Sequence, residues 1–154
     1  MLKTFLENIV ETQQPTFHLH KLVVDNIEIL SDRIEDDKIL LFHGTPLENF
    51  PKILKDGFDP NNYIYLSGLI VQSIYYQLKY EYTGNEEKFS LLVCSTRLGR
   101  VQNIKGVHDK IESIYDSTKC KYTQGKSTGF EYRIKSGDQV TPVAILHLRT
   151  LKFA

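Results

Sequence analysis

The chain has 154 residues, of which 41% are hydrophobic and 25% charged, a composition that excludes disorder and predicts one globular domain over residues 1–154. Its 19 basic side chains balance 19 acidic ones, so composition gives no support to a broad nucleic-acid surface, although a local patch stays open. It has no apolar run that could cross a membrane, no signal-peptide pattern and only two cysteines. We therefore expect an intracellular protein, cytoplasmic or nuclear, that is a monomer.

The first third of the chain predicts two helices and two strands. Apolar residues at helical spacing predict an amphipathic helix over 2–10, and β-branched runs predict strands over 22–30 and 38–42. Asn49 is suited to cap the start of a helix, and Gly57 is suited to the C′ position at its end, so we expect a short helix between them.

The middle of the chain predicts one more helix and one more strand. Residues 59–62 form a turn by composition, and the next helix is expected to begin with Ser67 as its cap and to run to about Tyr82. A strand is expected over 88–96. The segment 99–129 is polar and irregular, and a loop of that length in a compact domain usually carries function.

The last part of the chain is rich in strand patterns. Strands are expected over 130–135 and 140–153, with a turn at 136–139 between them. Helices early and strands late, without regular alternation, predict an α+β fold with antiparallel sheets.

Several motifs that would carry chemistry are incomplete. The Gly-Lys-Ser of 125–127 resembles the end of a P-loop, but the glycine needed five residues earlier is Cys120. His18 and His20 share one strand face and could bind a metal, yet no further Cys or His pair completes a ligand set, so we expect no metal. Cys94 lies in an apolar strand and is interpreted as a buried, inert thiol.

His43 and Gly44 end a buried strand and have two interpretations. The imidazole and the bare backbone edge beside it suit the close approach of a flat ligand. The alternative is a core histidine that precedes a turn.

Two tyrosines, a serine and a glutamate also allow a functional and an ordinary interpretation. Tyr65 and Tyr76 with the Ser73 hydroxyl suit a planar ring that bears an amide, or else they fill a contact between helix and sheet. Glu131 lies among strand residues, where burying a charge is costly unless the charge is used; the alternative is a solvent-facing position.

The order of the short blocks around these residues is more specific than any single block. The blocks are Leu41-Phe42-His43-Gly44-Thr45, Ile53-Leu54-Lys55-Asp56-Gly57-Phe58, Tyr65-Leu66-Ser67, Ser73-Ile74-Tyr75-Tyr76, Leu91-Leu92-Val93-Cys94 with Leu98-Gly99, Tyr115-Asp116-Ser117, and Glu131-Tyr132-Arg133-Ile134 with Gln139-Val140-Thr141-Pro142. This succession resembles the catalytic domain of the poly(ADP-ribose) polymerase family, the diphtheria-toxin-like ADP-ribosyltransferases.

The resemblance implies a fold of two packed, mainly antiparallel sheets flanked by short helices around an NAD cleft. It implies an NAD-dependent ADP-ribosyltransferase that releases nicotinamide, with NAD as co-substrate. The family's His-Tyr-Glu triad falls on His43, Tyr65 and Glu131. His43 would hold the adenosine ribose, and Glu131 would bind the nicotinamide ribose and stabilise the positive charge that develops as the glycosidic bond breaks.

The remaining implied residues bind the cofactor. The Gly44 backbone and the Ser73 hydroxyl would bind the nicotinamide carboxamide, Tyr65 and Tyr76 would enclose the ring, and Thr45 would lie close to His43.

Two departures from the family pattern shape the expected activity. Gln72 stands where polymer-forming members usually carry Lys, so transfer of one unit is favoured. The segment between Gly57 and Tyr65 is shorter than usual in the family, so the adenosine side is expected to be open.

The acceptor is not identified by the sequence. Protein, nucleic acid, a small molecule or water are all compatible with it, and water would make the chain an NAD glycohydrolase. A non-enzymatic module that binds NAD or ADP-ribose is a further alternative. Lys110, Lys119, Lys121 and Lys126 either contact an anionic partner or, as we favour, belong to a solvated loop.

Overall fold

The computed structural model describes residues 1–14, 20–31, 35–78, 88–106, 110–124 and 127–152. In chain order its helices and strands are α1 (Leu2–Thr12), β1 (His20–Ile29), β2 (Ile39–His43), α2 (Phe50–Asp56), β3 (Ile64–Ser67), α3 (Ile70–Gln77), β4 (Lys88–Thr96), β5 (Val101–Ile104), β6 (Ser117–Gln124), β7 (Ser127–Ile134) and β8 (Val140–Lys152). Short 3₁₀ turns precede α2 and β8, at Leu47–Asn49 and Gly137–Gln139. Within the ranges described, no helix is long and apolar enough to span a bilayer.

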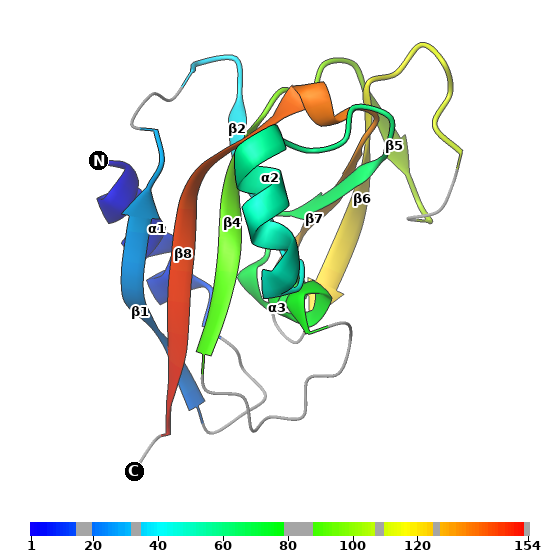
Figure 1. Ribbon diagram of the computed structural model, residues 1–154. Coiled ribbons are helices and arrows are strands. Elements are labelled where there is room, and N and C mark those ends of the chain that lie inside the picture. Colours follow the sequence, from blue (N-terminus) through cyan, green and yellow to red (C-terminus); the bar gives the residue numbers. More distant parts are fainter. Residues whose placement is uncertain (15–19, 32–34, 79–87, 107–109, 125–126, 153–154) are drawn as a thin grey trace.

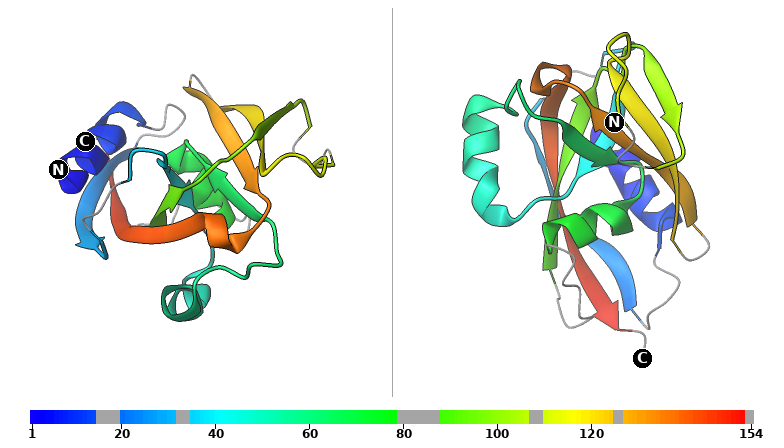
Figure 2. Two further views of the ribbon diagram at one scale, coloured as in Figure 1. Left: turned by 90° about the horizontal axis from the view of Figure 1, so that it is seen from above. Right: turned by 90° about the vertical axis from the view of Figure 1, so that its right-hand side faces the viewer.

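The strands form one eight-stranded sheet in the order β1-β8-β4-β2-β3-β7-β6-β5. The β5–β6 pairing is parallel and the other pairings are antiparallel, which confirms the expected α+β class. The two sheets implied by the resemblance are joined into one here, because β2 and β3 share the register pair Phe42 and Ser67. The joined sheet curls strongly, so its two halves lie at an angle to each other (Figure 2).

The central strand β4 contributes to cores on both faces of the sheet. Leu91 and Val93 pack with α1 and α3 on one face, whereas Leu92 and Cys94 pack with α2 on the other (Figure 1). Burial raises the pKa of the Cys94 thiol, which suits the inert role expected of it.

The free edge of the sheet at β1 is covered at one position by a side chain. The Gln14 amide accepts a hydrogen bond from Leu22 N at 2.9 Å and donates one to Leu22 O at 2.8 Å. It also donates to Val10 O, at the end of α1. A shift of register between Val24 and Asn26 then bends the strand. Gln14 therefore occupies, at Leu22, the place of a neighbouring strand.

Asn49 takes the N-cap position of α2 as expected, but its side chain makes no capping hydrogen bond to the helix. A cap residue has extended backbone angles, but the 3₁₀ turn before α2 gives Asn49 a φ of −86° and a ψ of −14°. Its amide instead donates to Thr45 Oγ1 at 2.8 Å. The other end is confirmed, because Gly57 closes the helix with a φ of 77°.

The third helix is shorter than expected. Ser67 ends β3, a strand that no residue pattern predicts, and α3 begins at Ile70. The Ser67 hydroxyl accepts from Leu69 N, and the Gln13 amide accepts from Ile70 N at 2.8 Å, so a distant side chain takes over part of the capping. The helix ends at Gln77, and the expected end at 82 lies outside the described residues.

The expected long loop over 99–129 is also wrong, because β5, β6 and the start of β7 lie within it. Its buried positions include Ser117 and Thr118, whose polar side chains conceal the apolar alternation of a strand. The Ser117 hydroxyl is satisfied by the carbonyl of Leu98 at 2.8 Å.

Candidate functional site

A cleft of about 390 Å³ opens where β2 and β3 separate beyond their shared register pair. It is lined by residues 43–46, 58–59, 62–65 and Tyr76. Five of the candidate residues are among them, namely His43, Gly44, Thr45, Tyr65 and Tyr76. The lining comes from the end of β2 and the residues after it, from the connection between α2 and β3, from the start of β3, and from α3.

His43 links the two strands at the point where their backbone pairing ends. Its Nδ1 lies 2.9 Å from the carbonyl oxygen of Tyr65, and since a carbonyl only accepts, Nδ1 carries the proton. Burial lowers the pKa of His43, an effect that the hydrogen bond to Tyr65 opposes only in part. In the neutral ring Nε2 is therefore an acceptor. The ring of Phe58 meets the imidazole edge-on, at 5.0 Å between centroids.

Gly44 and Ser73 bring β2 and α3 into backbone contact. A Cβ on Gly44 would lie 1.7 Å from the carbonyl oxygen of Ser73, so no larger residue fits without movement of the backbone. The Ser73 hydroxyl is fully buried and has no hydrogen-bond partner among the described residues. The cleft thus ends beside a polar group that lacks a partner within the described chain.

Tyr65 and Glu131 lie on the same face of the sheet. Residues directly opposite in an antiparallel pair share a face, and the register pairs Tyr65 with Arg133 and Ser67 with Glu131. Glu131 is 4% exposed, so the solvent-facing alternative is wrong. Its Oε1 accepts a hydrogen bond from the hydroxyl of Tyr76.

Thr45 is held by two amide side chains. Its Oγ1 accepts from Asn49 Nδ2, and its carbonyl accepts from Gln77 Nε2 at 3.4 Å. The Gln77 amide also pairs with the backbone of Ser90 in β4, accepting from its N at 2.9 Å and donating to its carbonyl. Gln77 thereby fastens the end of α3 to β4 and to the segment that follows β2.

Residue patterns alone missed part of the cleft. Phe58 and Tyr63 line it, and the Tyr63 ring lies 5.4 Å from the guanidinium carbon of the buried Arg133. The concentration of tyrosines after residue 62 was the available signal for Tyr63. The signal for Arg133 was strand alternation: residues two apart in a strand share a face, and Glu131 lies two residues before Arg133.

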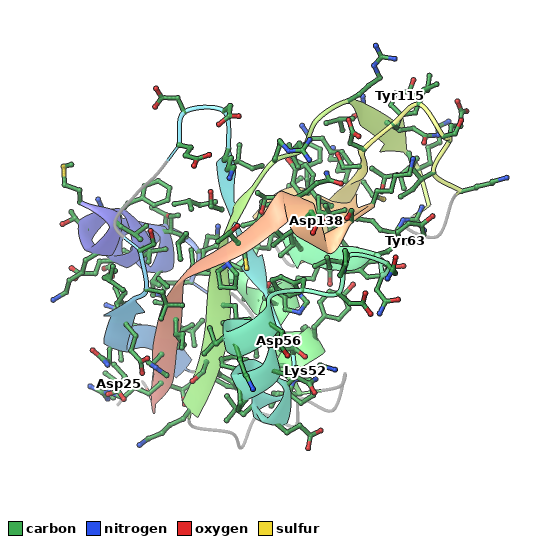
Figure 3. The ribbon with its side chains drawn as sticks, turned by 45° about the horizontal axis from the view of Figure 1, so that its top comes forward. Asp25, Lys52, Asp56, Tyr63, Tyr115 and Asp138 are labelled. Atoms are coloured by element: carbon green, nitrogen blue, oxygen red, sulfur yellow. The ribbon has the colours of Figure 1, made fainter. Side chains whose placement is uncertain are left out.

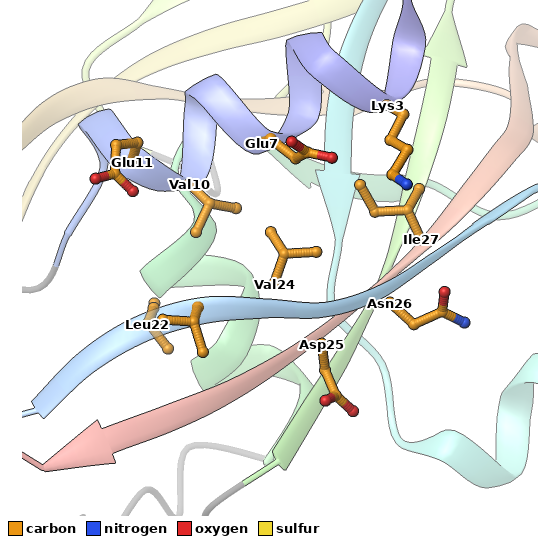
Figure 4. A pocket seen from close by; sticks show the side chains of 10 residues that line it. Lys3, Glu7, Val10, Glu11, Leu22, Val24, Asp25, Asn26 and Ile27 are labelled. Carbon is orange, nitrogen blue, oxygen red and sulfur yellow. The ribbon is translucent and has the colours of Figure 1, made fainter.

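A second cleft, of about 400 Å³, lies between α1 and β1 (Figure 4). Its polar lining comes from Lys3, Glu7 and Glu11 on the helix and from Asp25 and Asn26 on the strand. It contains none of the candidate residues. Figure 3 places Asp25 on the opposite side of the molecule from Tyr63 of the first cleft.

His18, one of the two histidines considered as metal ligands, lies outside the described residues. Among the residues described, no group of three or more His, Cys, Asp or Glu side chains could hold a metal ion.

Comparison with known proteins gives one family. The family model described as the poly(ADP-ribose) polymerase catalytic domain matches residues 3–148. No curated protein sequence gives a significant match to the chain. The matched span covers nearly the whole chain and includes every residue discussed for the first cleft.

Proposed function

Because the chain belongs to the poly(ADP-ribose) polymerase catalytic-domain family, whose members are NAD⁺ ADP-ribosyltransferases, we propose that it transfers single ADP-ribose units to a macromolecular acceptor. The observation that carries the proposal is the convergence of His43, Tyr65 and Tyr76 on one cleft, with the buried Glu131 carboxylate hydrogen-bonded to Tyr76. We treat residues 1–154 as one catalytic domain.

The nicotinamide end of NAD would lie between Gly44, Ser73 and the two tyrosines. The buried Ser73 hydroxyl lacks a partner in the described chain, and a carboxamide offers it both a donor and an acceptor. Gly44 lies directly beside Ser73 and lines the cleft, so its backbone groups can bind the other side of the same amide. Tyr65 and Tyr76 supply aromatic faces for the ring.

His43 would hold the adenosine ribose. Its Nδ1 donates to the Tyr65 carbonyl, which leaves Nε2 of the neutral ring to accept a hydrogen bond from a ribose hydroxyl. Because this interaction is present before and during the reaction, its loss should raise KM more than it lowers kcat.

Glu131 would act on the transition state. When the bond between the ribose C1″ and the nicotinamide nitrogen breaks, its electron pair leaves with nicotinamide and positive charge develops on the ribose. A buried carboxylate next to that charge stabilises it and can accelerate the reaction by about two to three orders of magnitude. The acceptor then forms the new bond to C1″ and releases a proton.

Gln72 favours one transfer rather than a polymer. It is buried in α3, one residue before Ser73, and its Oε1 has no partner among the described residues. It is a neutral amide at the position where polymer-forming relatives carry a cation. A site without that cation is proposed to bind ADP-ribose poorly as an acceptor.

The test is an assay of both products with purified protein, labelled NAD and a cell extract as the source of acceptors. Release of nicotinamide with label in discrete, unextended bands on a denaturing gel supports the proposal. A ladder of increasing length would show polymer formation. Label recovered only as free ADP-ribose would show that the chain is an NAD glycohydrolase, and no release of nicotinamide would contradict catalysis.

A further inference from the structure

The hydroxyl of Tyr76 is bonded to the carboxylate on which the proposed reaction depends. Tyr76 lies in α3 and lines the cleft, whereas Glu131 lies in β7, outside the residues that line the cleft, on the same face of the sheet as Tyr65. The two are 55 residues apart in sequence, and the Tyr76 hydroxyl donates to Glu131 Oε1. One side chain therefore provides both an aromatic wall and a donor to the acid.

The environment of Glu131 makes this hydrogen bond consequential. At 4% exposure the carboxylate has little contact with water, and a buried charge is costly unless donors satisfy it. Among the described residues, Tyr76 supplies the hydrogen bond found for this carboxylate. The last torsion of a glutamate is soft, so a donor on one oxygen also decides where the other oxygen points.

We infer that Tyr76 is a positioning residue for Glu131, in addition to forming a wall of the nicotinamide pocket; the inference rests on the proposed function. The hydroxyl holds Oε1, and Oε2 is then oriented toward the ribose. This fixes the negative charge beside C1″ before the bond breaks, so no reorganisation is needed in the transition state. The alternative is that only the aromatic ring of Tyr76 matters, in which case phenylalanine serves equally well.

The variant Tyr76→Phe separates the two roles because it removes one oxygen and keeps the ring. A hydrogen bond to a charged group is lost, so kcat should fall roughly tenfold to a hundredfold. The KM for NAD and the calorimetric affinity should stay within about twofold of the original, since the stacking surface remains. A kcat equal to that of the unaltered protein would overturn the inference.

Two further measurements exclude a merely structural effect. Tyr75→Phe removes a hydroxyl from the neighbouring residue of the same helix, which does not line the cleft, and should leave kcat unchanged. In a chain that already carries Glu131→Gln, adding Tyr76→Phe should cause almost no further loss of turnover, because the charge it positions is gone. The positioning role would be contradicted if Tyr75→Phe lowered kcat as much as Tyr76→Phe does. It would also be contradicted if Tyr76→Phe lowered turnover by the same factor in the Glu131→Gln chain as in the unaltered chain.

Failure of this inference is distinguishable from failure of the proposed function. If the unaltered protein releases no nicotinamide, the proposed function fails, and the positioning role of Tyr76, which rests on it, fails with it. If the unaltered protein is active and Tyr76→Phe is equally active, the proposed function stands and the positioning role alone is lost.

Discussion

The cleft at β2 and β3 and the cleft between α1 and β1 are nearly equal in size, at about 390 and 400 Å³, but they are built differently. The cleft between α1 and β1 is lined by charged and apolar side chains from one helix and one strand. Glu11 of this lining forms an ion pair with Lys21, which lies outside the lining, and the two side chains are 71% and 40% exposed. The cleft at β2 and β3 is lined by aromatic rings and backbone edges, with a buried carboxylate behind Tyr76.

Volume therefore does not distinguish the two clefts, whereas the way their residues constrain one another does. In the β2–β3 cleft, His43 is held by the Tyr65 carbonyl, Gly44 is in contact with Ser73, and Glu131 is held by Tyr76. In the α1–β1 cleft the charged groups lie toward solvent, where each is solvated at little cost. Groups that fix one another before a ligand arrives are the ones that can act on it without reorganisation.

The largest expected difference between the clefts is in turnover, when one carboxylate charge is removed in each of two variants. Glu131→Gln keeps the size and the acceptor oxygen but removes the charge, so kcat should fall by at least about a hundredfold while the affinity for NAD is retained. Glu11→Gln is the matched change in the other cleft and should leave turnover unchanged. Nicotinamide release and calorimetric titration with NAD measure both quantities. Retained turnover in Glu131→Gln would contradict its assigned role.

A large structural effect is expected at Gly44. In Gly44→Ala the new Cβ meets the Ser73 carbonyl oxygen at 1.7 Å, so the backbones must move apart, which typically costs about 1–3 kcal/mol of stability. The matched control is Gly68→Ala, because a Cβ there would lie 3.8 Å from the nearest atom, the Phe130 carbonyl oxygen. Denaturant unfolding measures the difference. Equal stability of the two variants would show that β2 and α3 are not tightly packed at Gly44.

The lowered pKa of His43 in the β2–β3 cleft predicts a pH dependence of the free energy of unfolding. In the unfolded chain the imidazole titrates near its ordinary value of 6.5, whereas burial lowers the pKa in the folded chain. As the pH falls through 6.5, the unfolded chain binds a proton that the folded chain does not, so stability declines until the folded pKa is reached. His43→Asn should flatten this part of a plot of unfolding free energy against pH. An unchanged slope would assign the effect to other groups.

The smallest effect is expected at the exposed ion pair that Glu11 of the α1–β1 cleft forms with Lys21. Lys21 Nζ and Glu11 Oε1 are 3.7 Å apart and well exposed, so Glu11→Gln should lower the free energy of unfolding by no more than about 0.5 kcal/mol. High salt should reduce even this difference. A loss above about 1 kcal/mol in thermal or denaturant unfolding would show that the pair is more constrained than its exposure indicates.

The strands with apolar or β-branched runs could be predicted from the sequence. The strand expected over 88–96 has the same bounds as β4, because its side chains enter two cores and read as a continuous apolar run. Strand β6 was missed because Ser117, Thr118 and Cys120 take its buried positions, and their burial depends on partners supplied by other segments. Local pattern cannot show a partner that is distant in sequence.

The same limit applies to the candidate site. The sequence could supply the residue types of His43, Tyr65 and Glu131 and, by resemblance, their roles. It could not show that Glu131 is buried or that its partner is the Tyr76 hydroxyl, because both follow from the register of β3 with β7 and from the position of α3. The sequence also suggested that Gly44 allows a ligand to approach closely, whereas in the structure the neighbouring backbone of Ser73 leaves no room for a side chain there.

The Gln14 amide at the edge of β1 has a consequence for the behaviour of the protein in concentrated solution. An open sheet exposes strand edges that invite pairing with another copy of the chain, the usual start of edge-to-edge aggregation. At Leu22 both backbone groups are already engaged by Gln14, and the register shift between Val24 and Asn26 bends the strand away from the flat geometry that a second copy would need. A foreign strand would have to displace an intramolecular amide and straighten the strand before it gained its first hydrogen bonds, so β1 is poorly suited to seed assembly.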